Sequence, residues 1–256
     1  MATTTPDPRN KVPAIALAFW VIKILSTTVG ETGADFLAVD VGWGQGVTSA
    51  LMAALLVVTL FLQLQARAYV PWIYWLSVVL VSVVGTQITD LLTDGLGVSL
   101  YASSAAFAVA LGAIFACWYG VERTLSIHHI VTRRRELFYW AAILCTFALG
   151  TAVGDLATEA LGLGFRLGAA VFGCLIAVTY LAWRLGADAV LTFWIAYILT
   201  RPFGAAIGDL LTQDRTYGGL GIGAMWTSAL FLTFIVSLVA LAQLGTLKSA
   251  LSNVGR

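Results

Sequence analysis

Acidic residues gather around four glycine-rich turns in an otherwise apolar chain, and they are the residues best suited to chemistry. The turns are Gly42-Trp43-Gly44, Gly95-Leu96-Gly97, Gly162-Leu163-Gly164 and Gly219-Leu220-Gly221. The acids near them are Glu31, Asp35, Asp40, Asp90, Asp94, Asp155, Glu159, Asp209 and Asp214. Oxygen ligands of this kind suit hard cations such as Mg²⁺, Mn²⁺ or Ca²⁺. Protons and organic cations could use the same carboxylates.

Four of these acids complete a motif that occurs four times: an aromatic residue, a Trp, nine residues, a Gly, four residues and an Asp. The copies are Phe19-Trp20…Gly30…Asp35, Tyr74-Trp75…Gly85…Asp90, Tyr139-Trp140…Gly150…Asp155 and Phe193-Trp194…Gly204…Asp209. Because Trp is rare and the spacing is identical, the motif indicates a fourfold duplication. The Trp and Asp lie about 22 Å apart on a helix. This places the Trp in an interfacial belt and the Asp near the other end. For the Gly we favour close helix packing over a carbonyl exposed to a ligand.

The composition is that of a membrane protein. The 256 residues are 60% hydrophobic and 11% charged, whereas a soluble chain has about 25% charged residues. A span needs roughly 20 apolar residues. The predicted spans are 13–39, 46–66, 72–93, 99–121, 137–160, 165–184, 187–212 and 222–245. We therefore predict an all-α integral membrane protein in which eight transmembrane helices form four tandem two-helix repeats. The repeats (13–66, 70–121, 136–184 and 187–245) would lie in parallel orientation within one membrane domain, 1–256.

The basic residues predict the orientation of these spans. One side would carry Arg9, Lys11, Arg67, Arg123, Arg133, Arg134, Arg135, Arg184, Lys248 and Arg256, and the other only Arg166 and Arg215. The positive-inside rule then places both termini in the cytoplasm. The remaining bases, Lys23 and Arg201, fall inside predicted spans.

Two accounts explain acids at this depth. In the first, they form structural ion pairs with Lys23 and Arg201. In the second, which we favour because there are too few bases and because intramembrane ionisable residues are costly, they line a polar cavity for a cation. The expected metal ligands are Asp35, Asp90, Asp155 and Asp209, followed by Glu31, Asp94 and Glu159. Lys23 and Arg201 would be internal counter-ions that release an acid when a cation arrives. The first, third, fifth and seventh spans would surround this site, with the others packed outside.

Other kinds of site have little support in the sequence. Cys117, Cys145 and Cys174 lie in apolar runs without CxxC spacing, which is typical of packing residues. The pair His128 and His129 lies in a basic loop without convergent ligands. No HExxH, GxSxG or Ser/His arrangement indicates an enzyme, and a net charge of +1 gives no indication of nucleic acid.

The first span also carries a family resemblance. The segment from Lys11-Val-Pro-Ala through Phe19-Trp20 and Lys23 to Glu31 and Asp35 resembles the opening of the bacterial uncharacterised membrane-anchored proteins, which contain tandem repeats of unknown function. The resemblance extends over the whole chain and implies the repeat architecture and a bacterial inner (plasma) membrane, but no activity. Lys23 corresponds to Val78, Ile143 and Tyr197, and Glu31 corresponds to Thr86, Thr151 and Ala205. The first copy is therefore expected to be specialised.

The function expected from these patterns is transport of a small cation, most readily a divalent metal of the Mn or Mg type. Two alternatives stay open: a proton-coupled transporter of an organic substrate, and a non-transporting scaffold or sensor. The expected partners are the lipid bilayer and the cation, which would also be the only bound cofactor. The sequence leaves the substrate, the direction of transport and homo-oligomerisation open.

Overall fold

The computed structural model describes residues 9–37 and 41–254, apart from the side chains of residues 34, 35 and 248–254. The described residues form eight long helices and no strand. The helices are α1 (Leu17–Asp35), α2 (Gly44–Gln65), α3 (Pro71–Asp90), α4 (Leu100–Glu122), α5 (Arg133–Asp155), α6 (Gly164–Arg184), α7 (Ala189–Thr212) and α8 (Ala224–Val254). Short π-helices, η2 (Leu91–Gly95) and η4 (Leu156–Ala160), continue α3 and α5, and the connections contain the 3-10 turns η3 (Ile127–His129) and η5 (Arg215–Tyr217).

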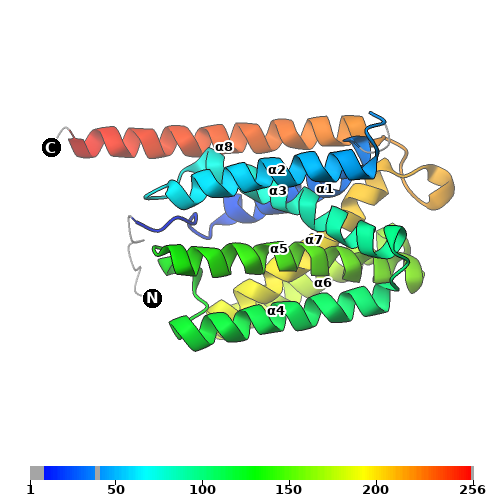
Figure 1. The fold of residues 1–256 in the computed structure, drawn as a ribbon, viewed down its shortest axis with the longest axis horizontal. Coiled ribbons are helices and arrows are strands. Elements are labelled where there is room, and N and C mark those ends of the chain that lie inside the picture. Colours follow the sequence, from blue (N-terminus) through cyan, green and yellow to red (C-terminus); the bar gives the residue numbers. More distant parts are fainter. Residues whose placement is uncertain (1–8, 38–40, 255–256) are drawn as a thin grey trace.

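The odd-numbered helices form a closed inner ring, as expected from the repeats. Helix α1 contacts α3, α3 contacts α5, α5 contacts α7, and α7 returns to α1. The even-numbered helices pack outside, α2 on α3, α4 on α5, α6 on α7 and α8 on α1 (Figure 1). Each outer helix therefore packs on the inner helix of the following repeat, and the last outer helix closes on the first inner one. The four glycine turns lie together at one end of the molecule (Figure 1).

Seven of the eight helices are long and apolar enough to cross a membrane, and α1 is not among them. The reason lies in its sequence: Lys23, Thr27, Thr28 and Glu31 lower its hydropathy. These residues are buried or nearly buried against the other inner helices. Of the eight predicted spans, seven are therefore supported among the described residues, and α1 differs because this helix presents polar groups to the ring.

The glycine of each motif marks the closest approach between neighbouring inner helices. A Cβ atom on Gly85 would lie 2.7 Å from the Cβ of Phe147, and one on Gly150 would lie 2.5 Å from the Cβ of Arg201. Likewise, Gly30 abuts Ser82 and Gly204 abuts Thr27. Each contacted residue lies three positions before the motif glycine of its own repeat, so one contact occurs at all four interfaces of the ring. The predicted packing role of these glycines is confirmed.

The motif tryptophans lie inside the bundle. Trp75, Trp140 and Trp194 are at most 5% exposed, and Trp20 is half-buried. They pack edge-on or tilted against the aromatic residues that precede them in the motif and those of neighbouring repeats. The interfacial position expected for these tryptophans concerns their depth in a membrane and stays a prediction. Motif spacing fixes their depth along the helix, but helix packing turns them inward.

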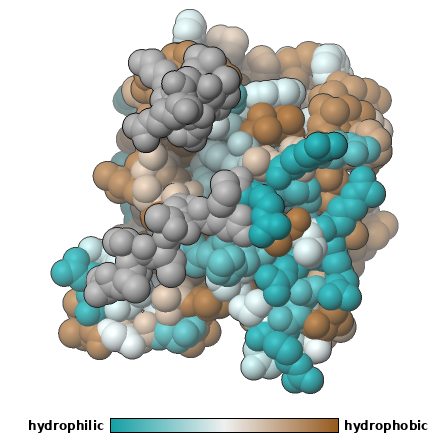
Figure 2. Space-filling model, turned by 90° about the vertical axis from the view of Figure 1, so that its left-hand side faces the viewer, coloured by the Kyte–Doolittle hydropathy of each residue, from teal (hydrophilic) through white to brown (hydrophobic). Residues whose placement is uncertain are grey.

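At the end opposite the glycine turns, the chain segment before α1 contacts two other stretches of the chain, residues 63–69 and 130–136. The Lys11 ammonium lies 2.6 Å from Glu136 of α5, and both side chains are buried. Gln63 of α2 donates to the second oxygen of Glu136 at 3.0 Å. The Asn10 side chain accepts from the backbone N–H of Ile130, and the Asn10 carbonyl accepts from that of Tyr69. We call these contacts the N-terminal clasp. Figure 2 shows this end, where hydrophilic residues gather.

We predict that Gly85→Ala destabilises the fold by about 2 kcal/mol, because the new methyl group overpacks the α3–α5 interface. The matched control is Gly112→Ala in α4, where a Cβ meets nothing within 4 Å. That change should be neutral or stabilise by up to about 1 kcal/mol through helix propensity. Thermal unfolding in detergent measures both. Equal effects of the two changes would contradict the proposed close packing.

We also predict that Lys11→Met costs about 3 kcal/mol, because it leaves the buried Glu136 carboxylate without its cation. The control is Arg134→Gln. Arg134 is 66% exposed and shares Glu122 with Arg135, so its loss should cost no more than about 1 kcal/mol. Denaturant unfolding compares the two. A Lys11→Met protein as stable as the control would show that the clasp contributes little.

Candidate functional site

A single guanidinium lies at the centre of the inner ring. Arg201 of α7 is fully buried. Its Nη2 atom lies 2.6 Å from a carboxylate oxygen of Glu31 in α1 and donates to the hydroxyl of Thr151 in α5 at 2.9 Å. The same nitrogen contacts the Thr86 hydroxyl of α3. Arg201 Nη1 donates to the carbonyl of Thr27 at 3.3 Å. One side chain therefore connects all four inner helices.

The repeat explains why these residues meet. Glu31, Thr86 and Thr151 each follow the motif glycine directly. The close glycine contacts bring the four inner helices to the same depth, so this position points to one central point in every repeat. The fourth equivalent, Ala205, is small and buried. These equivalent positions form a pseudo-fourfold layer of side chains that contains one carboxylate and two hydroxyls. The Arg201 guanidinium, which comes from the fourth repeat, binds to all three of these groups.

Lys23 is buried one layer further from the glycine turns. Its ammonium donates to the Tyr197 carbonyl at 2.9 Å and to the Thr200 hydroxyl at 2.5 Å. It lies 4.2 Å from the centroid of the Tyr197 ring and 4.9 Å from that of Phe147. These partners are neutral, and cation–π contacts of this geometry stabilise a desolvated ammonium. The two predicted counter-ions therefore differ: Arg201 is ion-paired with a predicted acid, whereas Lys23 lies among aromatic rings and backbone.

The remaining predicted acids lie on the glycine-turn side of Arg201. Asp90, Asp155 and Asp209 are half-buried, while Asp94 and Glu159 are exposed. Asp155 interacts electrostatically with Glu31, Glu159, Arg201 and Asp90. Asp90 and Asp209 also have interaction partners in the structure. The side chain of Asp35 lies outside the described residues. Acidic side chains therefore lie along the ring from its exposed end to the buried Arg201–Glu31 pair.

The helix geometry changes where these acids begin. α3 ends at Asp90 and α5 at Asp155, and each continues as a π-helix that carries the next acid, Asp94 in η2 and Glu159 in η4. π-Helical turns inside helices are rare and are frequent at functional sites. Residues 36 and 37, directly after Asp35, are π-helical as well, so three repeats share this feature at the same motif position, at the acidic end of the ring.

Within residues 9–37 and 41–254, no group of three or more His, Cys, Asp or Glu side chains is close enough to hold a metal ion. Electrostatic interaction between Asp155 and its neighbours extends over longer distances than metal coordination, which needs oxygens at about 2.0–2.6 Å. The described residues therefore give no support to the divalent-metal form of the prediction. The part of it that involves Asp35 lies outside them.

The ring is closed on the other side of Lys23. The Tyr74 and Tyr139 hydroxyls lie 2.5 Å apart, and the Phe19 ring packs on Trp75 and Phe193 at centroid distances of 5.6 and 6.0 Å. These first aromatic residues of the motif are all buried. An aromatic layer thus lies between the N-terminal clasp on one side and Lys23 and Arg201 on the other.

Several buried polar atoms near the centre have no hydrogen-bond partner among the described residues. They are Arg201 Nε, Ser82 Oγ and Tyr197 Oη. Buried polar groups are nearly always satisfied in folded proteins, and each missing bond costs about 1–3 kcal/mol. Atoms of this kind also occur on the outer helices, from Thr48 in α2 to Gln243 in α8, so they do not by themselves mark a ligand site.

Sequence reasoning identified Glu31 and Arg201 but not their pairing, and it missed the surroundings of Lys23. The signal was present in the motif. Arg201, Phe147, Ser82 and Thr27 share one motif position, while Tyr197 shares the position of Lys23. Aligning the four copies around a closed ring would have placed these side chains in adjacent layers.

The arrangement defines a class of protein: a helical ring built from four tandem repeats, with a charged centre. A family profile described as "Repeat of Unknown Function (DUF347)" matches residues 18–69, 73–124, 138–186 and 192–245. The chain therefore belongs to this repeat family, in agreement with the resemblance seen in its first span. Comparison with curated proteins and with solved structures gave no match.

We predict that Glu31→Gln costs about 3 kcal/mol, because it removes the carboxylate that compensates a fully buried guanidinium. Arg201→Met should cost a similar amount. The double variant should be less destabilised than the sum of the two, since neither charge is then left alone. A thermodynamic cycle from denaturant unfolding gives the coupling energy. Additive effects would contradict a direct ion pair. Asp94→Asn, at an exposed acid, is the control and should change stability by less than about 0.5 kcal/mol.

Proposed function

We propose that the protein is a multi-pass membrane carrier for a small cation, in which Arg201 is the internal counter-ion of the site. The observation that carries this proposal is the fully buried Arg201 guanidinium, held by Glu31 and by hydroxyls of two further inner helices. A cation that binds at the acidic end would compete with Arg201 for Glu31. Competition of this kind links binding to a rearrangement of all four inner helices.

Membrane insertion is supported by the seven apolar helices and by the exposed apolar side chains on α2, α4, α6 and α8. The distribution of Lys and Arg favours both termini in the cytoplasm. In that orientation the four repeats are parallel, the aromatic layer and the N-terminal clasp face the cytoplasm, and the acids face the other side. The described conformation would then be closed to the cytoplasm.

The chemistry around Arg201 indicates which cations suit the site. One carboxylate, two hydroxyls and a carbonyl surround a planar monovalent cation. We therefore favour a monovalent cation, either organic (a guanidinium or a primary ammonium) or a proton carried by one of the acids. A divalent metal would need further oxygen ligands close together. The test described below therefore includes Mg²⁺ and Mn²⁺ as separate additions.

A scaffold or sensor is the second candidate, and one observation favours it. Arg201 and Lys23 both have well-formed partners, and the aromatic layer closes one end of the ring. A ring that never opens would serve only to hold the helices together. The two functions differ in whether any cation binds in the acidic end.

The test is the unfolding temperature of the purified protein with guanidinium, ethylammonium, K⁺, Mg²⁺ or Mn²⁺ added at constant ionic strength. A ligand that binds only the folded state stabilises it by about 2.7 kcal/mol at 100 times its dissociation constant. We expect a cation-specific increase with guanidinium or ethylammonium, which is lost in the double variant Asp90→Asn plus Asp155→Asn. Flux into proteoliposomes then tests transport of the stabilising cation.

The matched control is Asp214→Asn. Hydrogen bonds from the backbone N–H and the hydroxyl of Thr216 hold the pKa of Asp214 below its usual value, so this exposed acid stays charged throughout the test. It is the N-cap residue of η5, beyond the end of α7, and its substitution should leave the response unchanged. An increase with Mg²⁺ or Mn²⁺ alone would return the proposal to a divalent metal. No increase with any cation would favour the scaffold.

A further inference from the structure

The N-terminal clasp holds together the connections that lead into α3 and α5. Its two central residues, Asn10 and Lys11, are buried. Asn10 accepts from the backbone N–H of Tyr69 at 3.1 Å and from that of Ile130 at 2.9 Å. Lys11 donates through its backbone N–H to the Ile130 carbonyl at 3.2 Å, and its ammonium lies 2.6 Å from Glu136. Two adjacent residues therefore fix the start of α3 relative to the start of α5.

On the α3 side, Tyr69 connects the clasp to the aromatic layer. Its backbone is held by Asn10. Its hydroxyl accepts from the indole N–H of Trp75 at 3.0 Å, and its ring packs edge-on against that of Tyr74 at a centroid distance of 5.8 Å. Trp75 and Tyr74 are buried residues of the layer. A shift of the layer on α3 would therefore displace Tyr69 and strain its contact with the clasp.

On the α5 side, Glu136 makes the corresponding connection. It is 1% exposed and lies three residues before Tyr139, so the two side chains share one face of α5. The Tyr139 hydroxyl lies 2.5 Å from that of Tyr74 on α3. The helices α3 and α5 are thus joined at two successive levels, through the clasp at Lys11 and directly through the two tyrosine hydroxyls.

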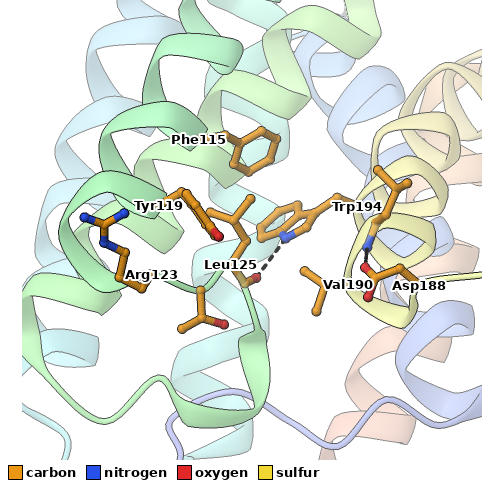
Figure 3. A pocket seen from close by; sticks show the side chains of 9 residues that line it. Phe115, Tyr119, Arg123, Leu125, Asp188, Val190 and Trp194 are labelled. Atoms are coloured by element: carbon orange, nitrogen blue, oxygen red, sulfur yellow. Dashed lines mark hydrogen bonds between the residues drawn. The ribbon is translucent and has the colours of Figure 1, made fainter.

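The helix α7 is bound to the same part of the chain. The indole N–H of Trp194 in α7 donates to the Leu125 carbonyl at 3.0 Å (Figure 3). Leu125 and Ile130 both belong to the connection between α4 and α5, so this connection contacts α7 as well as the clasp. A pocket of about 360 Å³, lined by Leu125 and Trp194 among others, lies beside it. The connection therefore has space on this side to move into.

The chain around Asn10 and Lys11 can detach without unfolding a helix. Residues 10–16 belong to no helix or strand, and segments outside the packed core open at lower free energy than the core itself. A buried ion pair such as Lys11–Glu136 adds little net stability, because its attraction is largely offset by the cost of removing both charges from water. The clasp thus combines well-defined geometry with contacts that can be broken together.

We propose that the N-terminal clasp is a latch on this end of the inner ring. With Asn10 and Lys11 in place, the starts of α3, α5 and α7 are held together and the aromatic layer is closed. Release of residues 10–12 frees these starts, and with them α1, which follows the segment directly, so that the layer parts. The inference rests on the proposed carrier function for what would pass the opened layer, whereas the opening itself is a property of the fold.

The test measures the separation of α3 and α5 at this end by pulsed electron paramagnetic resonance in lipid nanodiscs. Spin labels are attached at Trp72→Cys and Leu137→Cys, two exposed positions that are equivalent in their repeats, after the three native cysteines have been replaced by alanine. The clasp variant is Lys11→Met plus Glu136→Gln. It removes both charges together and keeps an acceptor for the Gln63 side chain.

We expect the clasp variant to gain a longer distance between the two labels. Minor conformations of a native state are typically about 0.1–10% populated, and loss of the latch should raise the share of the longer distance about tenfold. Labels at Leu96→Cys and Leu161→Cys, exposed and equivalent positions at the glycine-turn end, should keep their distance. The matched control is Arg134→Gln, which removes an exposed partner of Glu122 at the clasp end and should leave both distances unchanged.

The latch is disproved by a clasp variant whose α3–α5 distance equals that of the parent. It is equally disproved if the labels at the glycine-turn end separate as well, because the variant has then loosened the whole ring, or if Arg134→Gln has the same effect. The carrier function is judged separately, from the unfolding temperatures with added cations. A ring that opens but binds no cation would support the latch and refute the carrier, and a transported cation with unchanged distances would do the reverse.

Discussion

The buried Arg201 guanidinium is the group on which the inner ring depends. Removing an ion of this size from water costs several kcal/mol even after relaxation, and hydrogen-bond and ion-pair partners offset part of that cost. Glu31, Thr86, Thr151 and the Thr27 carbonyl supply those partners from α1, α3 and α5. The position of one side chain on α7 thereby constrains the relative position of the other three inner helices. A change in the charge balance at Glu31 would alter the whole ring.

The fourfold duplication explains how the charged residues come to lie asymmetrically in a ring of equivalent helices. Four glycines allow equal, close contacts around the ring, so equivalent positions form layers. The repeats differ in the side chains that they place in those layers. The first repeat supplies Lys23 and Glu31, the fourth supplies Arg201, and the middle repeats supply hydroxyl and apolar groups. A symmetric scaffold has in this way acquired one charged centre with an acidic side and an aromatic side.

The sequence predicts the repeat, the inner and outer helices and the packing role of Gly30, Gly85, Gly150 and Gly204, because spacing and helix length determine these features. It also identifies Arg201 as a counter-ion, because an arginine inside an apolar run needs a partner. It does not predict which acid pairs with Arg201, since this depends on the register between α1 and α7. The burial of Trp75, Trp140 and Trp194 was missed for a related reason: spacing gives depth but not the direction in which a side chain packs. The N-terminal clasp joins Lys11 to Glu136 across the chain, and no local pattern indicates such a contact.

The most direct test of the account observes the Arg201 side chain itself. The protein is labelled with ¹⁵N-arginine, its guanidinium signals are recorded by NMR in detergent, and the Arg201 signal is assigned by its loss in Arg201→Lys. The account predicts a slowly exchanging Arg201 signal that shifts and exchanges faster, saturably, as guanidinium or ethylammonium is added. An Arg201 signal that stays unchanged while the same cation raises the unfolding temperature would contradict the role of Arg201 as a releasable counter-ion.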